Sequence, residues 1–135
     1  LTSEEYAKNN GLKIRASIEG RAVAGVNWRM FGSGPIPATA KALKNAGLTI
    51  DDIDSMEINE AFAMVTMCPI DDFKLDPAKV NINGGACALG HPVGSTGSRI
   101  ILTLIHALKR TGGKKGIAAL CIGGGEATAV AIELL

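Results

Sequence analysis

The sequence is poor in aromatic residues and carries almost no excess charge. Phe, Trp and Tyr make up only 4% of its 135 residues, although hydrophobic residues make up 47%. A core of this composition must be aliphatic and rich in alanine, which suits helices packed on a sheet better than a β-sandwich. The formal net charge is +1, so the overall charge favours neither a nucleic acid nor a membrane as a partner.

Cysteine is scarce as well. The three cysteines form no CxxC pair, which disfavours a disulfide framework and favours a reducing compartment. We therefore expect a cytoplasmic location, with a mitochondrial or peroxisomal origin left open. Cys87 and His91 are four residues apart but have no third ligand nearby, so we expect no metal site. No stretch has the pattern of a signal peptide or a membrane span.

Strand and helix patterns alternate along the chain, which indicates an α/β layered domain. Five strands forming a mixed sheet are expected, at residues 12–26, 55–58, 79–82, 116–122 and 127–134. The last two should form an antiparallel hairpin around the glycines at 123–125. Helices are expected at residues 3–10, 37–45, 60–67 and 95–110, with Asn59 as a cap and Pro69 as an interruption.

The expected helix at 95–110 is apolar on nearly every side. Such a helix is normally buried all round, so we expect a central helix covered on both sides, the second cover being another domain or subunit. His106, on this helix, is then a core or interface residue.

Three segments at junctions between strands and helices carry polar or reactive groups. They read NEAFA (59–63), NGGACALGHPVGSTGSR (83–99) and CIGGG (121–125), and ligand sites in layered α/β folds gather at such junctions. Each segment also has a simpler explanation: helix capping for Asn59, an incidental histidine in a glycine-rich turn for His91, and a small buried side chain for Cys121.

In this order and spacing, the three segments resemble the C-terminal signatures of thiolases, the acyl-CoA C-acetyltransferases. GSGPIPAT (32–39) and LTSEEYAKNNGLK at the start are also similar to the family. The resemblance implies a thiolase-like fold of which this chain is one half, with residues 1–11 as the last helix of the preceding N-terminal half and 12–135 as the C-terminal domain. The chain begins without methionine, and we expect it to be part of a longer polypeptide.

The resemblance also implies an activity, acyl transfer between CoA thioesters. Two acetyl-CoA molecules would condense to acetoacetyl-CoA, or CoA would cleave a 3-oxoacyl-CoA. The family's nucleophilic cysteine lies in the N-terminal half, and no cysteine here matches it, so the isolated chain is expected to be inactive. The substrates would be CoA thioesters, with no tightly bound cofactor, and the full protein would form a dimer or tetramer.

Four residues match catalytic positions of the family. His91 would take the proton of the nucleophilic cysteine and donate to an enolate oxygen, and Cys121 would act as acid and base on the acetyl methyl group. Asn59 would hold a water that forms one oxyanion site with His91, and the Gly123 N–H would serve the other.

Three apolar residues match the family's tunnel for pantetheine and the acyl chain: Phe31, Ala61 and Phe62. Phe31 stands where a methionine is common. The alternatives are a non-catalytic thiolase-like subunit that binds acyl-CoA or scaffolds a complex, and a related condensing enzyme such as a ketoacyl synthase. A nucleotide site built on the glycines is disfavoured because no lysine follows them.

Overall fold

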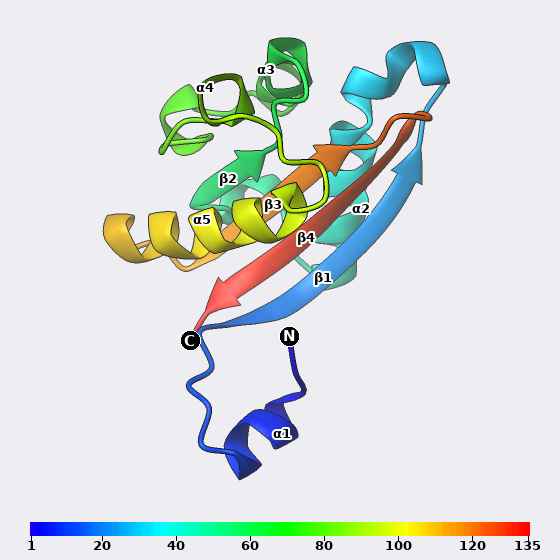
Figure 1. The fold of residues 1–135 in the computed structure, drawn as a ribbon. Coiled ribbons are helices and arrows are strands. Elements are labelled where there is room, and N and C mark those ends of the chain that lie inside the picture. The colour runs from blue at the N-terminus through cyan, green and yellow to red at the C-terminus, as the bar shows by residue number, and fades with distance from the viewer.

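A mixed four-stranded sheet forms the centre of the protein (Figure 1). The computed structural model describes residues 1–135. The strand order is β1-β4-β3-β2; β4 is antiparallel to both neighbours, and β2 is parallel to β3. The layered α/β architecture and the hairpin are confirmed, but the predicted number of five strands is wrong. The strands are β1 (Ala16–Gly25), β2 (Ser55–Ile58), β3 (Lys115–Cys121) and β4 (Glu126–Leu134).

The segment predicted as the fifth strand, residues 79–82, is almost entirely non-extended. A 3-10 turn, η3 (Pro77–Lys79), occupies its start, and Val80 makes a single parallel bridge to Met56. Asn81 then adopts a left-handed conformation with φ 50°, which ends the extended chain. The expected strand is therefore reduced to one bridge on the outer edge of β2.

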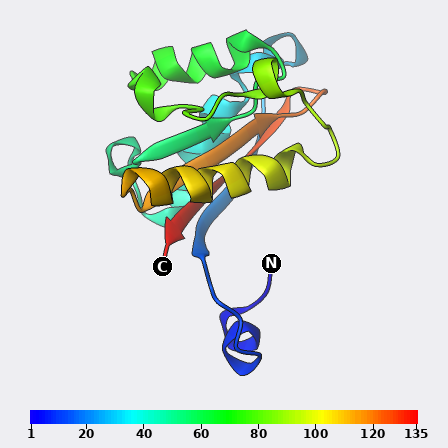
Figure 2. The ribbon, with the colours of Figure 1, turned by 60° about the vertical axis from the view of Figure 1, so that its left-hand side comes forward.

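Helices cover both faces of the sheet (Figure 2). Helix α2 (Pro35–Ala46) packs on β1 and β4, and α5 (Thr96–Thr111) packs on β2 and β3 from the other side. Because side chains alternate along a strand, Ala119 joins the core beneath α2 whereas Ala118 joins the core beneath α5. The helix expected at 37–45 is confirmed, but it begins two residues earlier, at Pro35, and is followed by Gly47, which has φ 68°.

Helix α5 is buried on one face only. Its side chains against the sheet are buried, but Leu102 is 54% exposed and His106 is exposed. Burial on all sides is therefore wrong for this chain alone, and so is the placement of His106 in its core. A second layer over the outer face of α5 stays a prediction.

Helix α3 (Ala63–Phe73) differs from the prediction at both ends. Phe62, not Asn59, occupies the residue before its first turn, and no side chain caps it. The helix passes through Pro69 without interruption and ends at Lys74, which has φ 54°. Asn59 therefore does not cap α3, and its side chain is available to the site described below.

The remaining elements are short. A 3-10 helix, η1 (Trp28–Ser33), fills the segment expected as a loop, and η2 (Ile50–Asp52) and α4 (Ala86–Leu89) lie in connections. Helix α1 (Glu4–Asn9) is capped by Ser3 and lies apart from the sheet (Figure 1). Its assignment to a preceding half stays a prediction. None of the helices combines the length and apolar character needed to cross a bilayer.

Candidate active site

Two of the three chemistry-bearing segments begin at the carboxyl ends of the parallel strands β2 and β3. Asn59 directly follows β2, and its N–H donates to the Ala119 carbonyl of β3 at 2.9 Å. Cys121 is the last residue of β3. Parallel pairing brings these two ends to the same edge of the sheet, where ligand sites of layered α/β folds occur.

His91 and Asn59, 32 residues apart in sequence, face each other at this edge. The Asn59 amide nitrogen lies 3.5 Å from the His91 Nε2, at the long limit of a hydrogen bond. Asn59 is only 1% exposed, and its Oδ1 is buried without a hydrogen-bond partner in the chain. This oxygen can accept a hydrogen bond from a water or a substrate group, because a buried acceptor gains from being paired.

The tautomer of His91 follows from its second neighbour, Thr96. The Thr96 Oγ1 lies 2.7 Å from the His91 Nδ1 and 3.0 Å from the Pro92 carbonyl oxygen. A hydroxyl has one hydrogen, and Thr96 gives it to Pro92, so it must accept from an Nδ1–H. The neutral imidazole then carries its lone pair on Nε2, the nitrogen that faces Asn59. His91 is therefore oriented as a base toward the site.

Cys121 ends β3 and Gly123 follows it two residues later, at the edge of the sheet where Asn59 follows β2. Burial raises the pKa of the Cys121 thiol above its ordinary value, so the thiol stays protonated at neutral pH. No hydrogen bond joins it to His91 or Asn59. The Gly123 N–H has no acceptor within the chain, and a Cβ at Gly123 would meet no atom within 4 Å. This donor is therefore accessible to a bound group.

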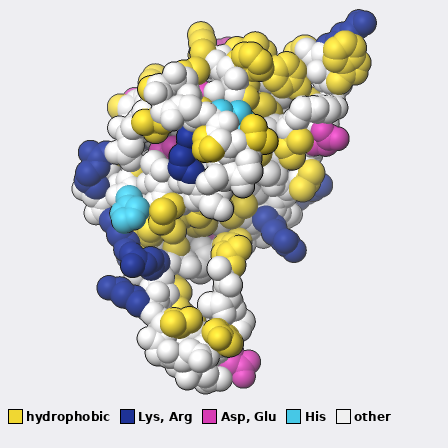
Figure 3. Space-filling model, viewed as in Figure 1, with side chains coloured by type: hydrophobic (Ala, Val, Ile, Leu, Met, Phe, Trp, Pro, Cys, Tyr) yellow, Lys and Arg dark blue, Asp and Glu magenta, His cyan; other side chains and the backbone are white.

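Two of the three predicted tunnel residues come together next to the site. The rings of Phe31, on η1, and Phe62, before α3, pack edge to face with centroids 5.8 Å apart. Ala61 is partly covered by the main core. Hydrophobic side chains gather over α3 and η1 at the top of the molecule in Figure 3. Phe62 is 59% exposed, so this wall can contact an apolar chain.

Sequence reasoning missed a set of polar groups that supports the site. Asn81, within the supposed fifth strand, donates to Glu60 Oε1 at 2.9 Å, and the Cys87 N–H donates to Glu60 Oε2 at 3.0 Å. Burial alone would raise the pKa of Glu60, but these hydrogen bonds and the nearby Arg99 lower it. The sequence did hold one signal against an extended chain here, namely Asn81 itself, since asparagine tolerates left-handed backbone angles.

Glu57 is a buried carboxyl on β2, two residues before Asn59. It is 3% exposed, and its Oε1 has no hydrogen-bond partner in the chain. Burial raises its pKa to about 7, opposed by Arg99 and reinforced by Glu60. A Glu in a strand of four buried residues gives no sequence signal of this kind, because its neighbours come from other elements.

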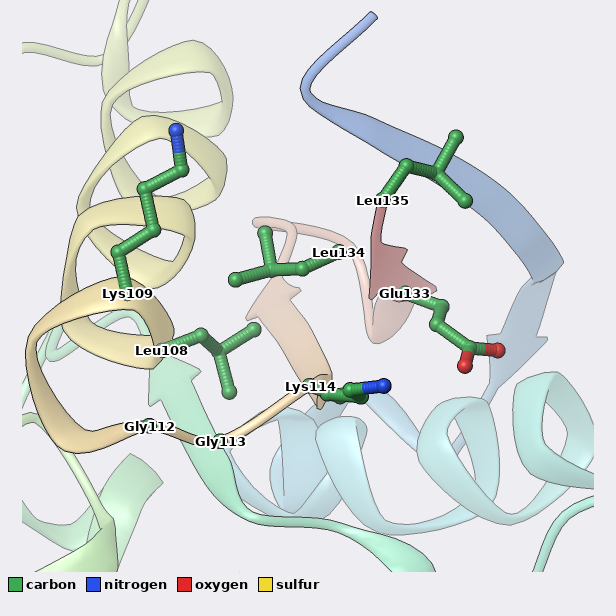
Figure 4. Close-up of a pocket in the computed structure, with 8 residues that line it drawn as sticks. All are labelled: Leu108, Lys109, Gly112, Gly113, Lys114, Glu133, Leu134 and Leu135. Carbon is green, nitrogen blue, oxygen red and sulfur yellow. The ribbon is translucent and has the colours of Figure 1, made fainter.

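A surface groove of about 510 Å³ lies at the opposite end of the sheet. Figure 4 shows Lys109 and Leu108 of α5 on one side of it and Glu133 at the end of β4 on the other. No residue of the candidate site lines it, and a helix carboxyl end does not favour anions. Nowhere does the structure gather three His, Cys, Asp or Glu side chains in a metal-binding arrangement.

Comparison with known proteins gives consistent matches. The family model described as "Thiolase, C-terminal domain" matches residues 12–134. The "3-ketoacyl-CoA thiolase" of Aliivibrio salmonicida is 52% identical over 98% of this chain and 35% of its own length. The "Acetyl-CoA acetyltransferase" of Syntrophomonas wolfei is 50% identical over 100% of this chain and 35% of its own length.

Solved structures agree with these matches. The Bacillus anthracis acetyl-CoA acetyltransferase superposes with a TM-score of 0.94 at 49% identity, over 99% of this chain and 34% of that one. The human mitochondrial 3-ketoacyl-CoA thiolase in complex with CoA superposes with a TM-score of 0.95 at 45% identity, with the same coverage. The chain thus spans about a third of the length of the proteins it matches.

Proposed function

This chain belongs to the thiolase family as its C-terminal domain, and from this premise we propose that it supplies the acid–base half of an active site for acyl transfer between CoA thioesters. The supporting observation is the arrangement of His91, whose Nδ1 is held by Thr96 at 2.7 Å and whose Nε2 faces Asn59 at 3.5 Å. The reaction would be condensation of two acetyl-CoA molecules to acetoacetyl-CoA and CoA, or cleavage of 3-oxoacyl-CoA by CoA.

The first half-reaction uses a nucleophilic cysteine that an N-terminal half must provide. His91 Nε2 takes the thiol proton, the thiolate attacks the thioester carbonyl, and CoA leaves with the proton that His91 returns to its sulfur. In condensation, Cys121 gives its own proton to His91, and the resulting thiolate removes a proton from the methyl group of the second acetyl-CoA. The carbanion attacks the acyl-cysteine, and the thiolate released there takes the proton back from His91. The Asn59–His91 pair and the Gly123 N–H stabilise the two oxyanions. Cleavage runs through the same steps in reverse.

The substrate would be held by its apolar portion. Phe31, Ala61 and Phe62 form the wall that we assign to the pantetheine and acyl chain, and one similar solved structure is described as a complex with CoA. The proposal includes no tightly bound cofactor. It includes a dimer or tetramer as the assembled enzyme, which would cover the outer face of α5, and a cytoplasmic location.

The test compares this chain alone with the chain joined to an N-terminal thiolase half. Acetoacetyl-CoA and CoA are added, and loss of the enolate absorbance is followed. We expect no turnover by the chain alone, because it lacks the nucleophile, and turnover by the joined protein. Turnover by the chain alone would contradict this division of the machinery. A joined protein that binds CoA without turnover would instead be a non-catalytic subunit.

Thr96 provides a second prediction, because it fixes the tautomer of His91. Thr96→Ala removes the acceptor for the Nδ1–H and should lower kcat of the joined protein about 3- to 10-fold, the worth of one hydrogen bond. Thr96→Ser keeps the hydroxyl and should stay within about twofold of the parent. Steady-state kinetics of the pair decide the point: equal losses in both variants would mean that packing of the threonine methyl matters and the hydroxyl does not.

A further inference from the structure

The outer edge of β2 is closed by a side chain in place of a fifth strand. Successive residues of a strand direct their backbone N–H and C=O groups to opposite sides. The Asn59 N–H points toward β3, so the N–H and C=O of Ile58 point away from β3, to the outer edge of β2. Asn81 meets both of them: its Oδ1 accepts from the Ile58 N–H at 2.8 Å, and its Nδ2 donates to the Ile58 carbonyl at 2.9 Å. A single amide thus completes the pairing of the residue that precedes Asn59.

The same amide also fixes the residue that follows Asn59. Asn81 Nδ2 donates to Glu60 Oε1 at 2.9 Å, and Glu60 Oε2 accepts from the Cys87 N–H in α4 at 3.0 Å. A Cβ at Gly85 would overlap the Glu60 carboxylate, so the glycine makes room for this contact. The end of β2 is thereby tied to the short helix from which the chain runs on to His91.

The backbone of Asn81 indicates that these contacts hold it in place. Asn81 and Lys74 are the two residues other than glycine with positive φ, at 50° and 54°. Positive φ is unfavourable for residues that carry a side chain. Such a conformation is kept where contacts with the surrounding residues hold it. For Lys74 the setting is an ordinary helix end. For Asn81 it is three hydrogen bonds that flank a residue of the candidate site.

Building on the proposed acyl transfer, we propose that Asn81 is a positioning residue that fixes Asn59 against His91. Its amide holds Ile58 and Glu60, one on each side of Asn59, and so sets where the Asn59 side chain points. Asn81 touches no reacting atom in this scheme. It acts on the rate because a catalytic group displaced by about 1 Å can cost up to roughly 100-fold in rate.

The test replaces Asn81 and, as a control, Lys74 by glycine, which adopts positive φ without strain. In the joined protein, Asn81→Gly removes the amide and should lower kcat roughly 10- to 30-fold while KM for acetoacetyl-CoA stays within about threefold. The matched control, Lys74→Gly, should leave both constants within about twofold. A kcat within twofold of the parent in Asn81→Gly overturns the proposal, as does a loss of kcat that Lys74→Gly shares.

Amide hydrogen exchange of the same proteins separates this inference from the proposed function. Exchange at the Ile58 N–H should accelerate in Asn81→Gly and not in Lys74→Gly, and unchanged exchange overturns the proposal. Absence of turnover in the parent protein would contradict the proposed function, whereas the exchange result still tests the contact. If Asn81→Gly does not fold, the kinetics of Asn81→Asp are measured instead, because aspartate loses the donor to the Ile58 carbonyl and to Glu60 but keeps the acceptor for the Ile58 N–H. Its kcat should fall by the same roughly 10- to 30-fold, and a kcat within twofold of the parent overturns the proposal.

Discussion

Replacing His91 by asparagine is expected to lower kcat/KM of the joined protein about 1,000- to 10,000-fold. The histidine would act in both half-reactions, first as the base for the nucleophilic thiol and then as an oxyanion donor. General-base catalysis alone contributes roughly 100- to 10,000-fold, and a lost oxyanion donor adds to that. Few other single changes in this chain remove two functions at once.

The geometry makes asparagine the informative replacement. An asparagine amide can still donate to Thr96 Oγ1, as the His91 Nδ1–H does over 2.7 Å, but it places no lone pair at the position of Nε2. The loop is therefore retained and the base is lost. The measurement is steady-state kinetics in both directions, together with the amount of acyl-enzyme formed from radiolabelled acetyl-CoA, which should fall in step with the rate.

His106 is the matched control, since it is the second of the two histidines and lies on the exposed face of α5. His106→Asn should leave the chemical step within a few-fold of the parent. If His91→Asn kept a rate within tenfold of the parent while still folded, His91 would not be the base. The glycine-rich turn would then have a purely structural purpose, which was the simpler explanation of its sequence.

Those parts of the fold that depend on local signals could be predicted from the sequence. Gly47 and Gly112 after helices, and the glycines of the β3–β4 turn, act through their own backbone preferences. Proline likewise marks the first turn of α2, although the helix was expected to begin at Pro37 and begins at Pro35. These preferences need no partner from elsewhere in the chain. The elements that they bound were accordingly placed within a few residues of their positions in the structure.

One failure occurred where distant residues decide the conformation. Asn81 leaves the extended region while its amide pairs with Ile58, 23 residues away, and no pattern within 79–82 reports that partner. The error on α5 has another origin. Leu102 is the one apolar side chain among its exposed positions, the others being Ser98, His106, Lys109, Arg110 and Thr111. The apolar run at 100–105 was taken as burial on all sides, although this spacing is typical of a helix buried on one face.

The candidate site divides in the same way. The residue types of Asn59, His91 and Cys121 could be singled out, but their grouping came from resemblance to a family and not from the spacing. Physical reasoning on Asn59 alone favoured a helix cap, which the structure contradicts, since α3 begins at Ala63. The role of Thr96 was missed, because five residues after a histidine in a loop is no recognisable spacing.

Replacing Cys121 by alanine should lower the rates of condensation and cleavage about 100- to 10,000-fold, the usual range for a lost acid–base group. Its effect should differ in kind from that of His91→Asn. The thiol acts on the methyl carbon of the second substrate, and the transfer of an acetyl group to the nucleophilic cysteine needs no such proton. Cys121→Ala should therefore still form acetyl-enzyme and release CoA, but then stop.

The state of the thiol supports this division. Burial raises the pKa of Cys121, so at neutral pH it holds its proton and can give it to the carbanion formed on cleavage. A nucleophile needs the opposite, because the thiolate is the attacking form. The environment of Cys121 in this chain thus suits a proton donor better than an acyl carrier, in keeping with the assignment of the nucleophile to the other half.

Three measurements on one protein decide the assignment: radiolabelled acetyl-enzyme, exchange of labelled CoA into acetyl-CoA, and the rate of condensation. Cys121→Ala should keep the first two within a few-fold of the parent and lose the third. Cys68→Ala, which alters a free cysteine on α3, is the control and should keep all three. If Cys121→Ala lost acetyl-enzyme formation as well, the thiol would take part in acylation, and the separation of roles between His91 and Cys121 would be wrong. If condensation survived, the protein would not use Cys121 as its acid or base.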